Sequence, residues 1–200
     1  MIKLIIFDIG GVLVDFMEDM YIHFLHGEVL PEVSEAKLSK FIMPLIELME
    51  FGLLSVPELE HMVGKHFKGH RINLRWVEGF KRNAKPIMST IGLINGLNKT
   101  HKVVLLTNVS YSRLAELKDT YLKLVKVKTI FASCDLKLRK PEPAIYEYVL
   151  KQMKVKPGEV VFVDDQIENV IGAEKLGIHA IWFRNKTRLV EDLGALGIWK

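Results

Sequence analysis

Residues 4–13 read Leu4-Ile5-Ile6-Phe7-Asp8-Ile9-Gly10-Gly11-Val12-Leu13. The compact aliphatic run Ile2–Phe7 ends at one carboxylate, and a pair of glycines follows shortly after it. Aliphatic runs of this length are typical of strands buried on both faces, as in parallel sheets. In such sheets ligands bind beyond the carboxyl ends of the strands, which is where Asp8 is expected. The stretch therefore predicts a parallel sheet whose first strand leads into a functional residue.

The rest of the chain alternates between strand-like and helix-like patterns. Four further β-branched or aromatic runs have the length of a strand: Val103–Thr107, Ile130–Ser133, Val160–Val163 and His179–Phe183. Helical patterns separate them: Ile87–Lys99, Ser110–Lys123, Pro141–Met153, Ile167–Leu176 and Lys186–Leu196. Repeated strand–helix alternation predicts an α/β fold, with a parallel sheet covered by helices on both faces.

Residues 16–85 interrupt this alternation, because their patterns are helical without a convincing strand. Ser34 begins a stretch whose apolar residues are spaced by three and four: Leu38, Phe41, Ile42, Leu45 and Met49. A capping box at Ser55–Glu58 predicts a second helix, with the apolar face Leu59, Met62, Val63 and Phe67. We expect residues 1–15 and 86–200 to form the core, and residues 16–85 to form an inserted helical cap above its ligand edge.

Composition limits the class of protein. The 200 residues are 49% hydrophobic and 26% charged, which suits one folded α/β domain with an insertion. The net charge of +4 comes from dispersed basic residues, so no nucleic-acid partner is expected. Cys134 is the one cysteine and forms no internal disulfide. Because Lys3 and Asp8 interrupt the apolar start, we expect no signal peptide and no membrane partner, but a cytoplasmic monomer or homodimer.

Polar residues follow three of the predicted strands, and a lysine begins the helix before the fourth strand. The set is Asp8, Thr107, Asn108, Lys140, Asp164 and Asp165. Adjacent carboxylates repel and need a cation or a proton. Oxygen donors without cysteine or histidine favour Mg²⁺ over Zn²⁺. A lysine and a hydroxyl suit phosphoryl oxygens, and a carboxylate that attacks phosphorus forms an aspartyl-phosphate.

Four ordered motifs resemble those of the haloacid dehalogenase superfamily of aspartate-nucleophile phosphohydrolases, over essentially the whole chain. They are residues 5–13, Leu105-Leu106-Thr107-Asn108, Arg139-Lys140-Pro141-Glu142-Pro143, and Val161-Phe162-Val163-Asp164-Asp165 with Asn169, Gly172-Ala173 and Leu176-Gly177-Ile178. The chain is most similar to the helical-cap, phosphatase-like branch with a Phe-Asp-x-Gly first motif. This resemblance implies a Rossmann-like core with strand order 5-4-1-2-3.

The resemblance also implies roles for individual residues. Asp8 is the expected nucleophile, and within the acidic pair Asp165 is the expected metal ligand, which Asp164 supports. The expected catalytic residues are Asp8, Thr107, Lys140 and Asp164; the phosphate-binding residues are Asp8, Thr107, Asn108 and Lys140; the Mg²⁺ ligands are Asp8, the Gly10 carbonyl and Asp165. The implied activity is Mg²⁺-dependent hydrolysis of a small phosphorylated metabolite.

One position departs from the superfamily pattern. Where a second aspartate usually serves as general acid/base, this chain has Gly10. A positioned acid/base is worth ~10²–10⁴-fold in rate. Asp15 is a possible substitute; alternatively it caps the next helix or lies in solvent. Because an activated leaving group needs less protonation, we expect a sugar 1-phosphate or a similar ester.

Two other functions stay open. One is a phospho-ligand sensor that lost turnover at Gly10. The other is a carbon–phosphorus hydrolase, which needs a Schiff-base lysine such as Lys37 or Lys40. The histidines His23, His26, His61, His66 and His70 are interpreted as surface or cap residues rather than zinc ligands. Residues 15–18 and 83–87 are expected to act as hinges of the cap.

Overall fold

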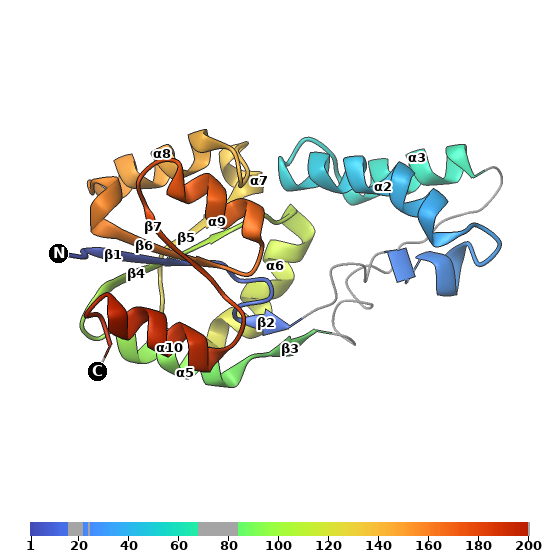
Figure 1. Ribbon diagram of the computed structural model, residues 1–200. Helices are drawn as coiled ribbons and strands as arrows, with labels where there is room; N and C mark the ends of the chain where they lie inside the picture. Colours follow the sequence, from blue (N-terminus) through green and yellow to red (C-terminus); the bar gives the residue numbers. More distant parts are fainter. Residues whose placement is uncertain (16–21, 24, 68–83, 200) are drawn as a thin grey trace.

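A computed structural model describes residues 1–15, 22–23, 25–67 and 84–199 of the chain. Its centre is a parallel sheet of β1 (Leu4–Phe7), β4 (Lys102–Thr107), β5 (Ile130–Ala132), β6 (Val160–Asp164) and β7 (His179–Trp182). The strands lie in the order β5-β4-β1-β6-β7 (Figure 1). Numbered from one to five along the chain and read from β7, this order is 5-4-1-2-3. The predicted α/β Rossmann-like fold is confirmed.

Helices cover both faces of the sheet (Figure 1). The helices α5 (Met88–Leu97), α6 (Tyr111–Asp119) and α10 (Lys186–Ala195) pack on one face, and α8 (Pro143–Met153) and α9 (Ile167–Glu174) pack on the other. Successive strand residues point to opposite faces. In β1, Phe7 therefore packs with the first group of helices and Ile6 with the second. This double burial explains why the central strands are aliphatic throughout.

Several predicted boundaries shift by one to four residues. Ser133 begins the short helix α7 (Ser133–Leu136) instead of ending β5, and its hydroxyl accepts a hydrogen bond from the Val109 amide at 2.9 Å. The helix α6 ends at Asp119 and is followed by the 3₁₀ turn η2 (Tyr121–Leu124). A second 3₁₀ turn, η3 (Pro157–Glu159), precedes β6. Helix α8 begins at Pro143, so Lys140 lies in the preceding loop and not at a helix start.

The described part of residues 16–67 is helical, with the π-helical turn η1 (Leu25–Val29), α2 (Glu35–Glu50) and α3 (Val56–His66). These helices share a hydrophobic cluster separate from both faces of the sheet. The capping box at Ser55 is present, since its amide donates to Glu58 at 2.8 Å. On the predicted stripe of α2, Phe41 is only half-buried and stacks on His66 at 3.8 Å. This contact gives His66 a packing role.

A two-stranded antiparallel ribbon links the helices to the core. It consists of β2 (Val14–Asp15) and β3 (Lys85–Pro86). The expectation of no strand within residues 16–85 was therefore wrong at Lys85, which pairs with Asp15. Two residues are too few to leave a sequence pattern. Of the expected hinge segments, residues 16–18 and 83 lie outside the described part of the chain, as does His70.

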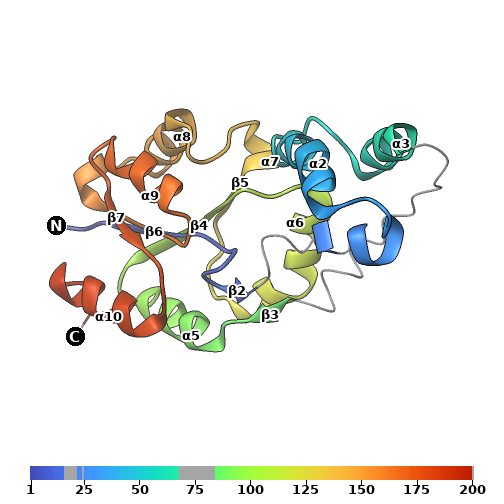
Figure 2. The ribbon, with the colours of Figure 1, turned by 45° about the vertical axis from the view of Figure 1, so that its right-hand side comes forward.

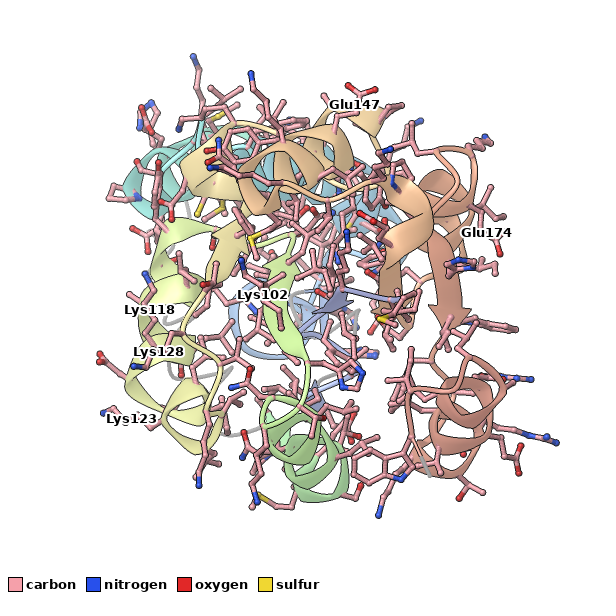
Figure 3. All side chains as sticks on the ribbon, turned by 90° about the vertical axis from the view of Figure 1, so that its left-hand side faces the viewer. Lys102, Lys118, Lys123, Lys128, Glu147 and Glu174 are labelled. Carbon is pink, nitrogen blue, oxygen red and sulfur yellow. The ribbon has the colours of Figure 1, made fainter. Side chains whose placement is uncertain are left out.

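The surface shows dispersed charge over the face seen in Figure 3. Figure 3 labels lysines of α6, η2 and the loop that follows (Lys118, Lys123 and Lys128) and glutamates of α8 and α9 (Glu147 and Glu174), so both signs of charge occur on this face. None of the helices in the described ranges is long and apolar enough to cross a lipid bilayer.

Candidate functional site

A cavity of about 400 Å³ opens at the carboxyl ends of β1 and β4. Asp8 follows β1, and its amide donates to the Val163 carbonyl at 2.9 Å, which continues the pairing of β1 with β6. Thr107 is the last residue of β4. Both side chains are buried and line the cavity with Asn108, Lys140 and Asp165. With Gly10, which also lines it, the cavity holds six of the seven predicted site residues.

Lys140 is the most buried cation of the site, with only 1% of its surface exposed. Its ammonium lies 2.9 Å from Asp8 Oδ1 and 2.5 Å from Asp164 Oδ2, and donates to the Leu106 carbonyl at 3.2 Å. Burial lowers the pKa of Lys140, but Asp164 and Asp8 outweigh it and raise that pKa above its usual value. Lys140 therefore stays protonated and joins the two aspartates.

Asp164 has all its carboxylate oxygens engaged and does not line the cavity. Its Oδ1 accepts from the Gln166 amide at 2.9 Å and from Asn169 Nδ2 at 3.0 Å, while Oδ2 accepts from Lys140. The side chain is fully buried. It was expected among the catalytic residues, but these contacts give it the geometry of a residue that positions Lys140.

Asn108 holds the loop that carries Lys140. Its Oδ1 accepts from the Lys140 amide at 2.9 Å, and its Nδ2 donates to the Lys140 carbonyl at 2.8 Å. This reciprocal pair joins residues 32 positions apart in the chain. Asn108 was expected to bind phosphate; its side chain bonds the backbone of Lys140, and the residue also lines the cavity.

Asp8 is held in an environment that disfavours its charge. Burial raises the pKa of Asp8 to about 7, although Lys140 opposes the change, and Asp164 and Asp165 add repulsion. The contact with Lys140 is an ion pair outside hydrogen-bond angles, so the buried Oδ1 of Asp8 has no hydrogen-bond partner. The charged neighbour of Asp8 Oδ1 is therefore the Lys140 ammonium, and this ion pair favours the ionised form of the buried carboxylate.

The donors near Asp8 fit a hard divalent cation. One oxygen from each of Asp8, Asp164 and Asp165 lies within 4.8 Å of the others, and within the described ranges no other group of three or more such side chains is this close. Three carboxylates and one ammonium carry an excess of negative charge. Carbonyl and carboxylate oxygens are the ligands that Mg²⁺ prefers. The Gly10 carbonyl already accepts from the Val12 amide at 2.6 Å and retains a second lone pair.

Gly11 is required for Asp165 to approach the first strand. A Cβ at Gly11 would lie 1.9 Å from Asp165 Oδ2, and its φ of +60° also disfavours other residues. The indole of Trp182 donates to the Asp165 carbonyl at 2.8 Å. The second glycine of the first motif is therefore explained by the close approach of Asp165.

Sequence reasoning missed the part of the cavity wall that comes from α2. Its residues are Met43, Ile46, Glu47 and Glu50. Met43, Glu47 and Glu50 are spaced by four and three, so they form a helical face beside the buried stripe. That spacing was a usable signal, but it does not show which helix face meets a site. The cavity also includes Asp15, which is exposed, but neither Lys37 nor Lys40.

Two proteins of known activity are similar to this chain over most of its length. Sesquiterpene phosphatase astK of Aspergillus oryzae is 29% identical over 181 residues, which cover 88% of this chain and 87% of that protein. The D-ribitol-5-phosphate phosphatase of Bacteroides thetaiotaomicron is 28% identical over 188 residues, with 88% and 89% covered. Two proteins that this chain matches over nearly their full lengths are therefore phosphatases.

Solved structures share the fold. A HAD family enzyme from Bacteroides thetaiotaomicron superposes with a TM-score of 0.81 at 19% identity, covering 94% of this chain and 98% of that chain. Its wild-type complex with magnesium and inorganic phosphate gives a TM-score of 0.78 at 20% identity, with 94% and 99% covered. The sequence model of the haloacid dehalogenase-like hydrolases matches residues 2–177. The chain, a hydrolase with the core and strand-end residues described above, therefore belongs to the haloacid dehalogenase-like hydrolase family.

Proposed function

We propose that the protein is a Mg²⁺-dependent phosphomonoester hydrolase that acts through an aspartyl-phosphate on a small phosphorylated metabolite. The observation that carries the proposal is the buried Asp8–Lys140 ion pair at the end of β1, with an Asp8 oxygen that lacks a hydrogen-bond partner. The two phosphatase relatives support the same reaction class. The magnesium and phosphate complex of the fold neighbour supports the choice of cation.

In the proposed reaction, Thr107 and Lys140 bind the non-bridging phosphoryl oxygens and orient the phosphorus toward Asp8. An oxygen of Asp8 attacks phosphorus, the bond to the leaving oxygen breaks, and that oxygen takes up a proton. Water then attacks the aspartyl-phosphate, which restores the Asp8 carboxylate and releases inorganic phosphate. Asp8, the Gly10 carbonyl and Asp165 would hold Mg²⁺, which favours ionised Asp8 and offsets the charge of the phosphoryl group.

The substrate we propose is a sugar phosphate with an activated leaving group, such as an anomeric ester. Gly10 supplies no acid, so the leaving oxygen depends on its own stability or on another proton donor. Asp15 is the candidate donor, because its residue lines the same cavity as Asp8. We further propose that residues 16–85 act as a cap, since the face of α2 closes one side of the cavity.

Turnover of an aryl phosphate, with Mg²⁺ or with a chelator, tests the proposal. We expect Mg²⁺-dependent release of phosphate and an acid-quenched phosphopeptide that contains Asp8. Asp8→Asn should abolish both. Binding of phosphate without turnover of any ester would instead establish the sensor. Neither of the lysines named for the carbon–phosphorus hydrolase, Lys37 and Lys40, lines the cavity. Cytoplasmic location and a monomeric or homodimeric state stay predictions.

A further inference from the structure

The end of α2 is bound to the core segment that leads to Lys140 (Figures 1 and 2). Ser133 Oγ donates to the Glu50 carbonyl at 2.7 Å, and Lys137 Nζ donates to the Gly52 carbonyl at 2.5 Å. Arg139 donates from its Nη2 to Glu50 Oε2 at 2.9 Å. These bonds span more than 80 positions of sequence. The core thus binds the C-terminal end of α2 through the backbone carbonyls of Glu50 and Gly52 and through the Glu50 side chain.

Gly52 shows that this contact is close. Its φ is +62°, and an added Cβ would lie 2.5 Å from Lys137 Nζ and 2.6 Å from the Cys134 carbonyl. A larger residue would strain the backbone and separate the two surfaces. The turn after α2 is therefore shaped to meet α7 and the loop beyond it.

Arg139 has the central electrostatic role in this contact. Its guanidinium lies 5.8 Å from the Phe51 ring centroid, and its Nη1 lies 3.7 Å from Glu47 Oε1. The side chains of Arg139 and Glu50 are each only 21% exposed, so solvent screens their ion pair less than a surface pair. Glu47, which is 55% exposed, is beyond hydrogen-bond distance of Arg139. Its carboxylate retains capacity to accept hydrogen bonds.

Glu47 and Glu50 of α2 and Arg139 of the core all line the cavity. Besides Asp8, Asp165 and Lys140, the cavity lining carries three carboxylates, of Asp15, Glu47 and Glu50, and two guanidinium groups, of Arg113 and Arg139. Carboxylates accept hydrogen bonds from hydroxyl groups and repel anions. A leaving group with several hydroxyls would therefore be favoured here over one with a second negative charge.

On the basis of the proposed function, we infer that Glu47 and Glu50 select phosphate esters whose leaving group is polyhydroxylated and uncharged, and that Arg139 is the positioning residue that holds them. Glu47 is the direct hydroxyl acceptor, because its ion pair with Arg139, at 3.7 Å, is beyond hydrogen-bond distance and leaves its carboxylate able to accept. Glu50 and Arg139 fix the end of α2 against the core.

Binding of two matched probes tests the selection, without requiring turnover. Glucose 1-phosphate and glucuronate 1-phosphate differ only in a hydroxymethyl against a carboxylate group. By calorimetry in chelator, where the proposed Mg²⁺-dependent hydrolysis does not proceed, we expect the wild type to bind the glucose ester about tenfold more tightly or better. Glu47→Lys should reduce or invert this ratio. The matched control is Glu147→Lys, on an exposed position of α8 outside the cavity wall (Figure 3), which should leave the ratio unchanged.

An unchanged ratio in Glu47→Lys, or a wild type that binds neither sugar ester, would overturn the inference. The aryl phosphate assay separates this failure from failure of the proposed function. If the wild type hydrolyses aryl phosphate with Mg²⁺ while its sugar-ester ratio does not respond to Glu47→Lys, only the selection is wrong. If it hydrolyses no ester, the proposed function fails whatever the binding ratio is.

A charge exchange tests the positioning role of Arg139. Arg139→Glu and Glu50→Arg should each reduce the glucose-to-glucuronate ratio, and the double variant should restore part of it. Amide exchange of residues 50–53 should accelerate in the single variants and slow again in the double variant. Arg188→Gln, which removes an exposed 2.8 Å ion pair with Glu191 on α10, is the matched control. Additive losses in the double variant would contradict coupling through this pair.

Discussion

Removing the charge of Asp8 should change how the stability of the metal-free protein depends on pH. Burial raises the pKa of Asp8 from 3.8 to about 7 in the folded protein. Between these two values the folded state holds a proton that the unfolded state releases, so the contribution of Asp8 to stability is complete below pH 4 and is lost as pH rises toward 7. The side chain introduced by Asp8→Asn has nearly the same shape but does not titrate, so the stability of this variant lacks this pH dependence.

The size of the effect follows from the shift. One pKa unit corresponds to about 1.4 kcal/mol. Between pH 5 and pH 7 the free energy of unfolding of the wild type should therefore fall by roughly 2 kcal/mol relative to that of the variant. For a chain of this size that is roughly 4–8 °C in the melting temperature.

Urea unfolding of both proteins in chelator at several pH values measures the difference directly, because the other titrating groups are shared. Added Mg²⁺ should reduce the wild-type loss, since the cation favours the ionised carboxylate. Parallel stability curves for wild type and variant from pH 5 to pH 7 would refute the reasoning that burial controls the charge of Asp8.

Four further changes have defined outcomes. Asp8→Asn should fold and lose all but a few per cent of aryl phosphate turnover; greater residual activity would remove Asp8 from the mechanism. Gly11→Ala should weaken Mg²⁺ binding measured by calorimetry about tenfold or more and cost roughly 1–3 kcal/mol in unfolding, because its methyl group meets Asp165; unchanged affinity would separate Asp165 from the cation. Gly10 is not among the glycines with positive φ, so Gly10→Asp is compatible with the backbone and should accelerate alkyl esters most, by something approaching ~10²-fold. A flat dependence of wild-type rate on leaving-group pKa, with chemistry rate-limiting, would point to Asp15 instead. Amide exchange in α2 and α3 should slow when Mg²⁺ and a phosphate mimic bind, and unchanged exchange would indicate a rigid cap.

Local patterns were sufficient for the core of the molecule. Aliphatic runs and the helices between them predicted the five strands and their parallel arrangement, because burial on both faces of a sheet leaves a direct mark on composition. The position of Asp8 and Thr107 at strand ends followed from the same logic. Element ends were less exact, as at Ser133 and Lys140, since hydrogen bonds to distant residues decide where a helix begins.

The tertiary structure alone showed which residues of α2 share the cavity with Asp8. Arg139 and Glu50 are 89 positions apart, and no local pattern pairs them. The helical spacing of Met43, Glu47 and Glu50 marked a face of α2 but not what that face would meet. By itself the sequence determined the α/β fold, the helical insertion and the identity of the residues at the strand ends, because each depends on neighbours along the chain. Contacts of the cavity depend on how separate elements pack, and only the folded chain brings their charges close enough to interact.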